Sequence, residues 1–247
     1  MLAIPACLGL SAGGAFSVAA WLAPVATLLV FLAHHALVPW AQRALERKPS
    51  PSGYVARRIV WGVLYLAAAS IVFAAAVSLS GASARGPLLA IAGVAAVLAA
   101  AYALAAVSGH ARSMTAEIPG MAGLALIASM MAAAAGRPPD RSLFGASLIA
   151  FGYSLSSLAF VRAYEWAREG RGRATAACVV AHAALAAALA GAAAAGVLPR
   201  WWWLPFVPVV IRTAWGLARP PENLRRLGLR EIWVAVAFTA IACVVLR

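Results

Sequence analysis

The sequence predicts an all-α integral membrane protein: one polytopic domain over residues 1–247, folded as a bundle of eight to nine transmembrane helices with a truncated first helix. Composition is the first reason, since 64% of the residues are hydrophobic and only 11% are charged, whereas a soluble domain has about 25% charged residues. The second reason is the recurrence of apolar runs of about 20 residues, the length that crosses a bilayer core of about 30 Å. These features exclude a soluble globular domain.

The apolar runs give the helices in chain order. The run 2–12 has about half the length of a span, so it is a re-entrant piece, a truncated helix, or the front of one long segment that breaks at Gly13-Gly14. The run 201–217 is short and is interrupted by two prolines. The runs 87–107 and 174–195 are built from alanine and glycine, which let membrane helices approach closely. The predicted spans are 15–34, 59–79, 87–107, 117–136, 142–163, 174–195, 201–217 and 231–246.

The net charge of +13 does not indicate a nucleic-acid partner, because the basic residues lie in short connectors rather than on a polar domain. The positive-inside rule places the most basic connectors in the cytoplasm. The protein is then a multi-pass membrane protein whose C-terminus faces outward, with Trp201–Trp203 as an outer interfacial anchor. The residues of these basic connectors are Arg43, Arg47, Lys48, Arg57, Arg58, Arg112, Arg168, Arg171, Arg173, Arg219, Arg225, Arg226 and Arg230.

Most other ionisable residues gather at or near the same predicted ends of the helices. Ionisable groups inside a membrane are costly and usually functional. That inference is strongest for His182, His34 and Glu117, which lie within or at the edge of apolar runs. The candidates for a polar cavity are His34, His35, His110, Glu117 and His182.

The four histidines also raise haem as a cofactor, which we do not expect. His34 and His35 are adjacent and point about 100° apart on a helix, so they cannot ligate one iron as a pair. His110 and His182 could do so, but nothing in the sequence specifies it. Three cysteines lie singly in apolar runs and are expected to be small buried hydrophobes rather than metal ligands: Cys7, Cys178 and Cys243.

The stretch YEWAREGRGR, which begins at Tyr164, holds two of the seven acidic residues of the chain. If the helix of the sixth long segment continues past Arg162, Glu165 and Glu169 share one helical face because they are four residues apart. A Mg²⁺ ion bound to a phosphate would neutralise them, since Mg²⁺ takes one or two carboxylates plus substrate oxygens. The alternative, which the local sequence favours, is a solvated helix end neutralised by Arg162, Arg168 and Arg173.

The chain resembles the YwiC-like family of bacterial membrane proteins, which is in turn similar to the UbiA superfamily of intramembrane prenyltransferases. UbiA-type enzymes have nine helices and a cytoplasmic-side cavity, with Asp-rich motifs after helices two and six that bind Mg²⁺ and an isoprenoid diphosphate. The stretches that carry the resemblance are FLAHHALVPWAQRALERK, RSMTAEIPGMAGLALIA, FVRAYEWAREGRGRATA, GVLPRWWWLPFVPVVIRTAW and RPPENLRRLGLREIWVAVAF.

The resemblance implies a UbiA-like, Mg²⁺-dependent prenyltransferase of the bacterial inner membrane. Glu165 and Glu169, an ExxxE in place of the second motif, would hold the metal. The diphosphate would be bound by Arg112, Arg162 and Arg168, because arginine suits bidentate recognition of phosphate.

The chain departs from these patterns in two places. The first Asp-rich motif is degenerate, since no carboxylate pair follows the second helix, and His34-His35-Ala36 stands where YwiC-like proteins usually have Arg-Glu-Pro. The Lys/Arg-Glu-His-Gly segment that leads into helix one in the family is also missing, and the chain starts in the middle of that helix. This predicts either an in-frame extension upstream of Met1 or loss of the element.

A second hypothesis keeps the fold without the chemistry. The protein would be a non-catalytic membrane subunit of a respiratory or cofactor-assembly complex that binds lipid, quinone or, less readily, haem in the same cavity. A transporter ranks lower, because the polar groups gather at one face instead of reaching the bilayer midplane, where transporters bind substrate.

Overall fold

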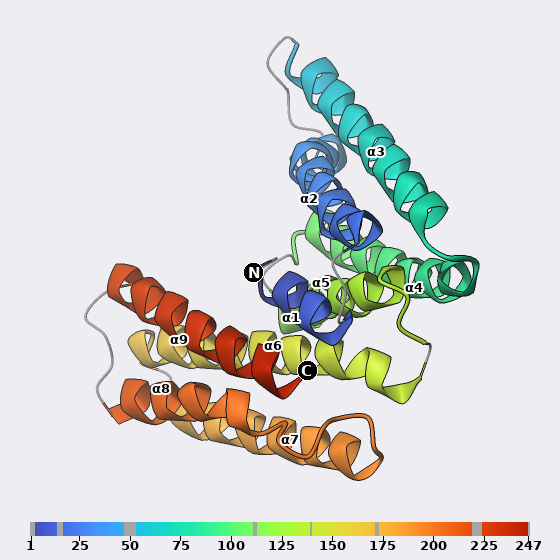
Figure 1. The fold of residues 1–247 in the computed structure, drawn as a ribbon. Helices are drawn as coiled ribbons and strands as arrows, with labels where there is room; N and C mark the ends of the chain where they lie inside the picture. Colours follow the sequence, from blue (N-terminus) through green and yellow to red (C-terminus); the bar gives the residue numbers. More distant parts are fainter. Residues whose placement is uncertain are drawn as a thin grey trace.

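The computed structural model of the protein describes residues 3–13, 17–46, 53–110, 113–138, 140–170, 173–218 and 224–246. All regular structure in these ranges is helical, which confirms the predicted all-α class (Figure 1). The helices are α1 (Ala3–Gly13), α2 (Val18–Leu45), α3 (Tyr54–Leu79), α4 (Ala82–Val107), α5 (Met114–Ala134), α6 (Gly145–Arg168), α7 (Ala174–Ala194), α8 (Val207–Ala218) and α9 (Leu224–Val245), with short 3₁₀ helices η1 (Arg141–Phe144) and η2 (Leu204–Phe206).

Within the described ranges, seven helices are long and apolar enough to cross a membrane: α2 to α7 and α9. Helices α1 and α8 have 11 and 12 residues. At 1.5 Å per residue they are about 16 to 18 Å long, shorter than a hydrocarbon core of about 30 Å. The first helix is therefore a short, separate element that ends at Gly13, and the predicted span at 201–217 becomes η2 followed by a short α8.

Helices α5 and α6 form the centre of the bundle together with α1. In α5 and α6, more than half of the apolar stretch is buried, 56% and 61% respectively. In the other long helices, 11% to 22% of this stretch is buried. Helix α1 packs on α5, α6 and α9. The contact with α5 is very close, because a Cβ atom added at Gly9 would lie 2.8 Å from the carbonyl oxygen of Ala128 and 2.8 Å from Cβ of Met131.

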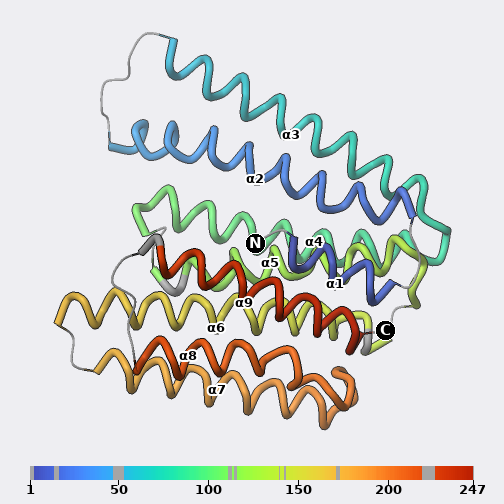
Figure 2. The backbone as a smooth tube through the Cα atoms, turned by 60° about the vertical axis from the view of Figure 1, so that its left-hand side comes forward, coloured from blue at the N-terminus to red at the C-terminus, as the bar shows by residue number. Residues whose placement is uncertain are grey.

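The other long helices lie around this centre. Both views place α2 and α3 on one side and α7 and α8 on the opposite side (Figures 1 and 2). Large apolar side chains on the outer faces are exposed, among them Ile71 on α3, Val97 on α4 and Val180 on α7. Apolar surface of this extent is stable against lipid chains but not in water, so these faces contact the bilayer.

Helix α2 extends to Leu45, whereas the predicted span ended at residue 34, so the start of a predicted connector is helical. Pro39 lies within this extension and has no N–H to offer the carbonyl of His35, four residues earlier. Arg58 of α3 supplies the missing donor, with its Nη1 atom 2.8 Å from that carbonyl oxygen. Helix α9 likewise starts at Leu224, seven residues before the predicted boundary.

Helix α6 also continues beyond its predicted end and reaches Arg168, with Glu169 as the C-cap residue. Gly170 then has a φ of 75°, in the left-handed region that favours glycine. Its N–H donates to the carbonyl of Ala167 at 3.1 Å, which closes the last turn. The helix thus passes Arg162, as required for Glu165 and Glu169 to share a face.

Candidate functional site

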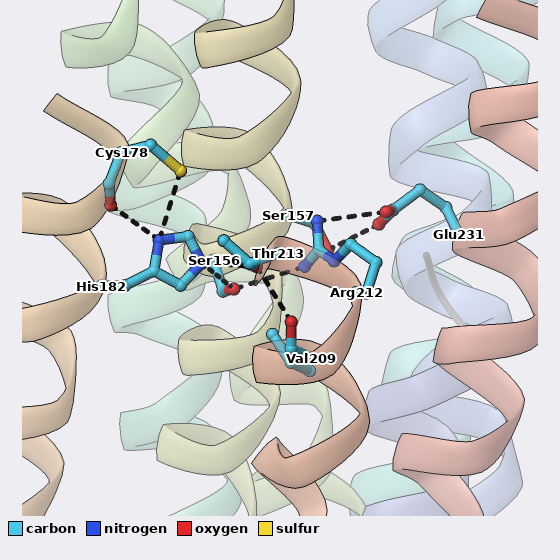
Figure 3. A network of polar contacts seen from close by, with 8 residues as sticks. All are labelled: Ser156, Ser157, Cys178, His182, Val209, Arg212, Thr213 and Glu231. Carbon is cyan, nitrogen blue, oxygen red and sulfur yellow. Dashed lines mark hydrogen bonds and ion pairs between the residues drawn. The ribbon is translucent and has the colours of Figure 1, made fainter. Parts of the chain in front are cut away.

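A network of polar contacts joins four helices in the C-terminal half of the bundle (Figure 3). Helix α8 contributes because one of its faces turns inward, and the buried residues at i, i+3, i+4 and i+7 of that face include Arg212 and Thr213. The side chains of the network are Ser156 and Ser157 on α6, Cys178 and His182 on α7, Arg212 and Thr213 on α8, and Glu231 on α9.

Arg212 stands at the centre of this network, with only 4% of its side chain exposed. Its Nη1 atom lies 3.1 Å from Oε1 of Glu231, and its Nη2 atom donates to Oγ of Ser156 at 3.4 Å. The guanidinium carbon lies 4.4 Å from the centre of the Phe160 ring, a distance at which a cation is attracted to the ring face. A charged side chain is held inside the bundle by one carboxylate, one hydroxyl and one aromatic ring.

Glu231 provides the counter-charge, and Oγ of Ser157 donates to its Oε2 atom at 3.1 Å. The ion pair is nevertheless only partly satisfied. Nε of Arg212 is buried without a hydrogen-bond partner among the described residues, and Nη1 and Oε1 are in contact without the alignment of a hydrogen bond. Buried polar groups are nearly always hydrogen-bonded in folded proteins, so this site has donor capacity that the described residues do not use.

His182 extends the network towards α7. Its Nδ1 atom lies 2.8 Å from the carbonyl oxygen of Cys178, so this nitrogen carries the proton of the neutral ring and donates it to the carbonyl. Its Nε2 atom then accepts from Oγ of Ser156 at 2.7 Å. Ser156 therefore accepts from Arg212 and donates to His182, which links the charged pair to the imidazole through one hydroxyl.

A pocket of about 430 Å³ lies beside Arg212, between α6, α8 and α9. Three aromatic rings and several aliphatic side chains form most of its wall, whereas its polar wall consists of two arginines and one glutamate. The lining residues are Phe160, Pro208, Ile211, Arg212, Trp215, Gly216, Leu227, Arg230, Glu231, Trp233, Val234 and Ala237. We call this the Arg212 pocket.

A second polar cluster brings together three of the predicted site residues. Arg162 of α6 donates to Oε1 of Glu117 on α5 at 2.6 Å and to Oε2 of Glu165 at 2.9 Å. One arginine thus pairs with a carboxylate of its own helix and with a carboxylate of α5. The side chain of Glu165 is 41% exposed, against 18% for Arg162, so this cluster lies nearer the surface of the bundle than Arg212.

The remaining residues of the predicted metal and diphosphate site are less closely gathered. Arg168 lies over the ring of Tyr164, at 6.0 Å from its centre, and Glu169 caps α6. Arg112 lies outside the described residues. Among the described residues, no three His, Cys, Asp or Glu side chains are close enough together to hold a metal ion.

The rings of His34 and His35 lie close together, with their centroids 5.5 Å apart. The ring of His34 stacks on Tyr102 at a centroid distance of 5.0 Å, and Nδ1 of His35 lies 3.0 Å from the carbonyl oxygen of Phe31. His110 is exposed in the turn after α4. Helix α4 packs on α2, α3 and α5, whereas α7, which carries His182, packs on α6.

Sequence reasoning found His182 but missed Arg212, the residue on which the network depends. A signal was available, because Arg212 is the single charged residue within the apolar run 201–217, and such a residue is expected to be functional. The prolines and tryptophans of that run drew the interpretation towards an interfacial anchor. Trp201 and Trp203 are indeed about half exposed. Cys178 is buried, as predicted, whereas the same prediction is wrong for Cys7, which is exposed, and Cys243 is only partly buried. The Nδ1 atom of His182 lies 2.8 Å from the carbonyl oxygen of Cys178 and 3.6 Å from its Sγ atom.

Comparison with known proteins gives a family for the chain. A family model described as "YwiC-like protein" matches residues 1–135, which is more than half of the chain and contains α1 to α5. Searches of curated proteins and of solved structures gave no match. The Arg212 pocket lies beyond the matched residues, and the wider resemblance to the UbiA superfamily stays a prediction. The chain belongs to the YwiC-like family.

Proposed function

We propose that the protein is a non-catalytic membrane subunit that binds a quinone in the Arg212 pocket. The observation that carries this proposal is the position of Arg212, a permanently charged side chain that lies inside the bundle and forms the polar wall of an aromatic pocket. Ionisable residues inside a membrane mark ligand and ion sites more often than structural positions.

The pocket suits the chemistry of a quinone. Its volume of about 430 Å³ is within the range of about 300–1,000 Å³ usual for small-molecule sites. Arg212 and Arg230 outweigh Glu231 by one positive charge, which favours a headgroup that accepts hydrogen bonds. The ring carbonyls of a quinone would accept from the guanidinium groups, and its flat ring would stack against Phe160, Trp215 or Trp233.

The surroundings of the pocket suit an isoprenoid tail. Trp215 and Trp233 are 57% and 73% exposed on the outer faces of α8 and α9, where lipid would cover them. A tail that leaves the pocket between these rings would pass directly into the bilayer. The same proposal has two further parts. The basic connectors face the bacterial cytoplasm, and the protein assembles beside a larger membrane complex.

Quinone titration in lipid nanodiscs tests this function, with quenching of tryptophan fluorescence as the readout. We expect saturable binding in the wild-type protein and at least a tenfold weaker affinity in the Arg212→Met/Glu231→Leu variant, which removes both charges together. Arg85→Met is the matched control, because Arg85 donates to the carbonyls of Ser78 and Ser80 and does not line the pocket. Equal affinities in the wild type and the double variant would exclude this pocket as the quinone site.

A Mg²⁺-dependent prenyltransferase is a second candidate function, favoured by the cluster of Arg162 with Glu117 and Glu165. Glu165 and Glu169 would hold the metal, and their two carboxylates match the donor set that Mg²⁺ takes beside a phosphate. Arg162, Arg168 and Arg112 would bind diphosphate oxygens. The metal would neutralise charge on the diphosphate. Arg162 would have to release Glu165 so that this carboxylate could bind the metal.

Binding of a radiolabelled prenyl diphosphate, with and without Mg²⁺, tests this second function. The transferase proposal expects saturable, Mg²⁺-dependent binding that is lost in Glu165→Ala/Glu169→Ala. Asp140→Ala, which changes an acidic residue outside α6, serves as the control for lost charge. Binding that is the same in the double variant as in the wild type would remove the site assignment.

A further inference from the structure

A second pocket, separate from the Arg212 pocket, lies between α2 and α3 and has a volume of about 580 Å³. It contains two arginines and a histidine, and none of its lining residues is acidic. The lining residues are Leu32, His35, Ala36, Tyr54, Arg57, Arg58, Trp61 and Tyr65. We call this the basic pocket. A concentration of positive charge without a carboxylate is the pattern expected of an anion site.

Arg58 of the basic pocket is held in place by its neighbours. Arg58 donates to the carbonyl oxygen of His35 at 2.8 Å, and its guanidinium carbon lies 5.2 Å from the centre of the Tyr54 ring. Arg43 lies over the same ring at 4.8 Å. Two guanidinium groups therefore lie close to the Tyr54 ring. Arg57, which also lines the pocket, adds a third positive charge, and its side chain is exposed.

The lining changes character along α3, one helical turn at a time. Arg57 and Arg58 occupy the first turn, Trp61 follows one turn later, and Tyr65 one turn after that. The rings of Trp61 and Tyr65 stack with a centroid distance of 5.8 Å. Across the groove, α2 contributes Leu32. The order basic, aromatic, aliphatic is the order of polarity across a membrane interface, where arginine meets phosphates and tryptophan and tyrosine lie at the headgroup level.

We propose that the basic pocket binds the headgroup of an anionic phospholipid. Arg57 and Arg58 take the phosphate oxygens, because guanidinium groups bind phosphate through paired charge-assisted hydrogen bonds. Trp61 and Tyr65 cover the glycerol backbone, and the acyl chains leave along Leu32 towards the bilayer. A headgroup that adds a cationic amine is disfavoured by the three arginines, which makes the pocket selective for lipids with a net negative charge.

Native mass spectrometry of the protein released from neutral detergent micelles tests the proposal. The micelles carry equal amounts of phosphatidylglycerol and phosphatidylcholine, and a parallel sample receives inorganic phosphate at the same concentration as the phosphatidylglycerol. We expect the wild type to retain one phosphatidylglycerol at least fivefold more often than phosphatidylcholine. Arg57→Gln removes one positive charge without touching the contact between Arg58 and His35, and it lowers this preference at least threefold.

Arg200→Gln is the matched control, because Arg200 also lies over an aromatic ring, that of Trp201 at 5.6 Å, and does not line the basic pocket. Its preference for phosphatidylglycerol stays that of the wild type. The proposal is overturned if Arg57→Gln and Arg58→Lys both keep the full preference, or if phosphatidylcholine is retained equally well. Displacement of the lipid by inorganic phosphate at equal concentration also overturns it, because the site would then bind a free anion and gain nothing from the lipid.

Discussion

Replacement of Glu231 by alanine is expected to lower the free energy of unfolding by about 3–5 kcal/mol, the usual cost of removing one partner from a buried ion pair. Arg212 cannot lose its proton in a protein, and its side chain is 4% exposed. The variant therefore leaves an uncompensated charge inside the bundle. The apparent melting temperature in neutral detergent measures the effect, which corresponds to a decrease of roughly 6–20 °C for a chain of this size.

Two variants separate the loss of a counter-charge from the loss of a side chain. Arg212→Met/Glu231→Leu removes both charges and keeps apolar volume, so its stability is expected to equal or exceed that of the wild type. Glu165→Ala removes a carboxylate from Arg162 near the surface, where Glu117 still pairs with the arginine, and costs less than about 1 kcal/mol. If Glu231→Ala proves as stable as Glu165→Ala, the description of Arg212 as a buried charge is wrong.

The close approach of α1 to α5 gives the second large effect. A methyl group at Gly9 would lie 2.8 Å from the carbonyl oxygen of Ala128 and from Cβ of Met131, and neither atom can move away by a side-chain rotation. Gly9→Ala therefore pushes the two helices apart and is expected to lower the free energy of unfolding by about 1–3 kcal/mol. Thermal unfolding in neutral detergent, followed by tryptophan fluorescence, measures the change.

Gly93→Ala on α4 is the control, and it is expected to have the opposite effect on the free energy of unfolding. A methyl group at Gly93 meets no atom within 4 Å, and alanine favours a helix over glycine by about 1 kcal/mol. This variant should be as stable as the wild type or more stable. Equal stability of Gly9→Ala and Gly93→Ala would contradict the packing of α1 against the centre of the bundle.

The sequence predicted the class and the order of the helices because the length of an apolar run is set by bilayer thickness, which needs no knowledge of tertiary contacts. It predicted the helix ends poorly where helices leave the apolar zone. The end of α2 contains Pro39, Gln42 and Arg43, and such residues are typical of connectors. The segment is helical because α3 and α4 supply partners: Arg58 binds the His35 carbonyl, and Nε2 of Gln42 donates to the carbonyl of Ala106 at 2.6 Å.

The candidate sites could likewise be predicted from the sequence only in part. Glu117, Arg162 and Glu165 could be grouped from the sequence, because orientation alone places the start of α5 and the end of α6 on one side of the membrane. The pairing of Arg212 with Glu231 could not be predicted, since it depends on which face of α8 turns towards α6 and α9. No inward face of the run 201–217 could be predicted, because two prolines and four tryptophans obscured its periodicity.

Photoaffinity labelling in lipid nanodiscs with an azido-quinone tests most directly whether the Arg212 pocket binds quinone. The account predicts labelled peptides from α6, α8 and α9, in particular around Phe160, Trp215 and Trp233, and loss of this labelling in Arg212→Met/Glu231→Leu. An excess of unlabelled quinone should compete with the label in the wild-type protein. Labelling confined to other helices, or labelling of the same peptides that persists in the double variant, would contradict it.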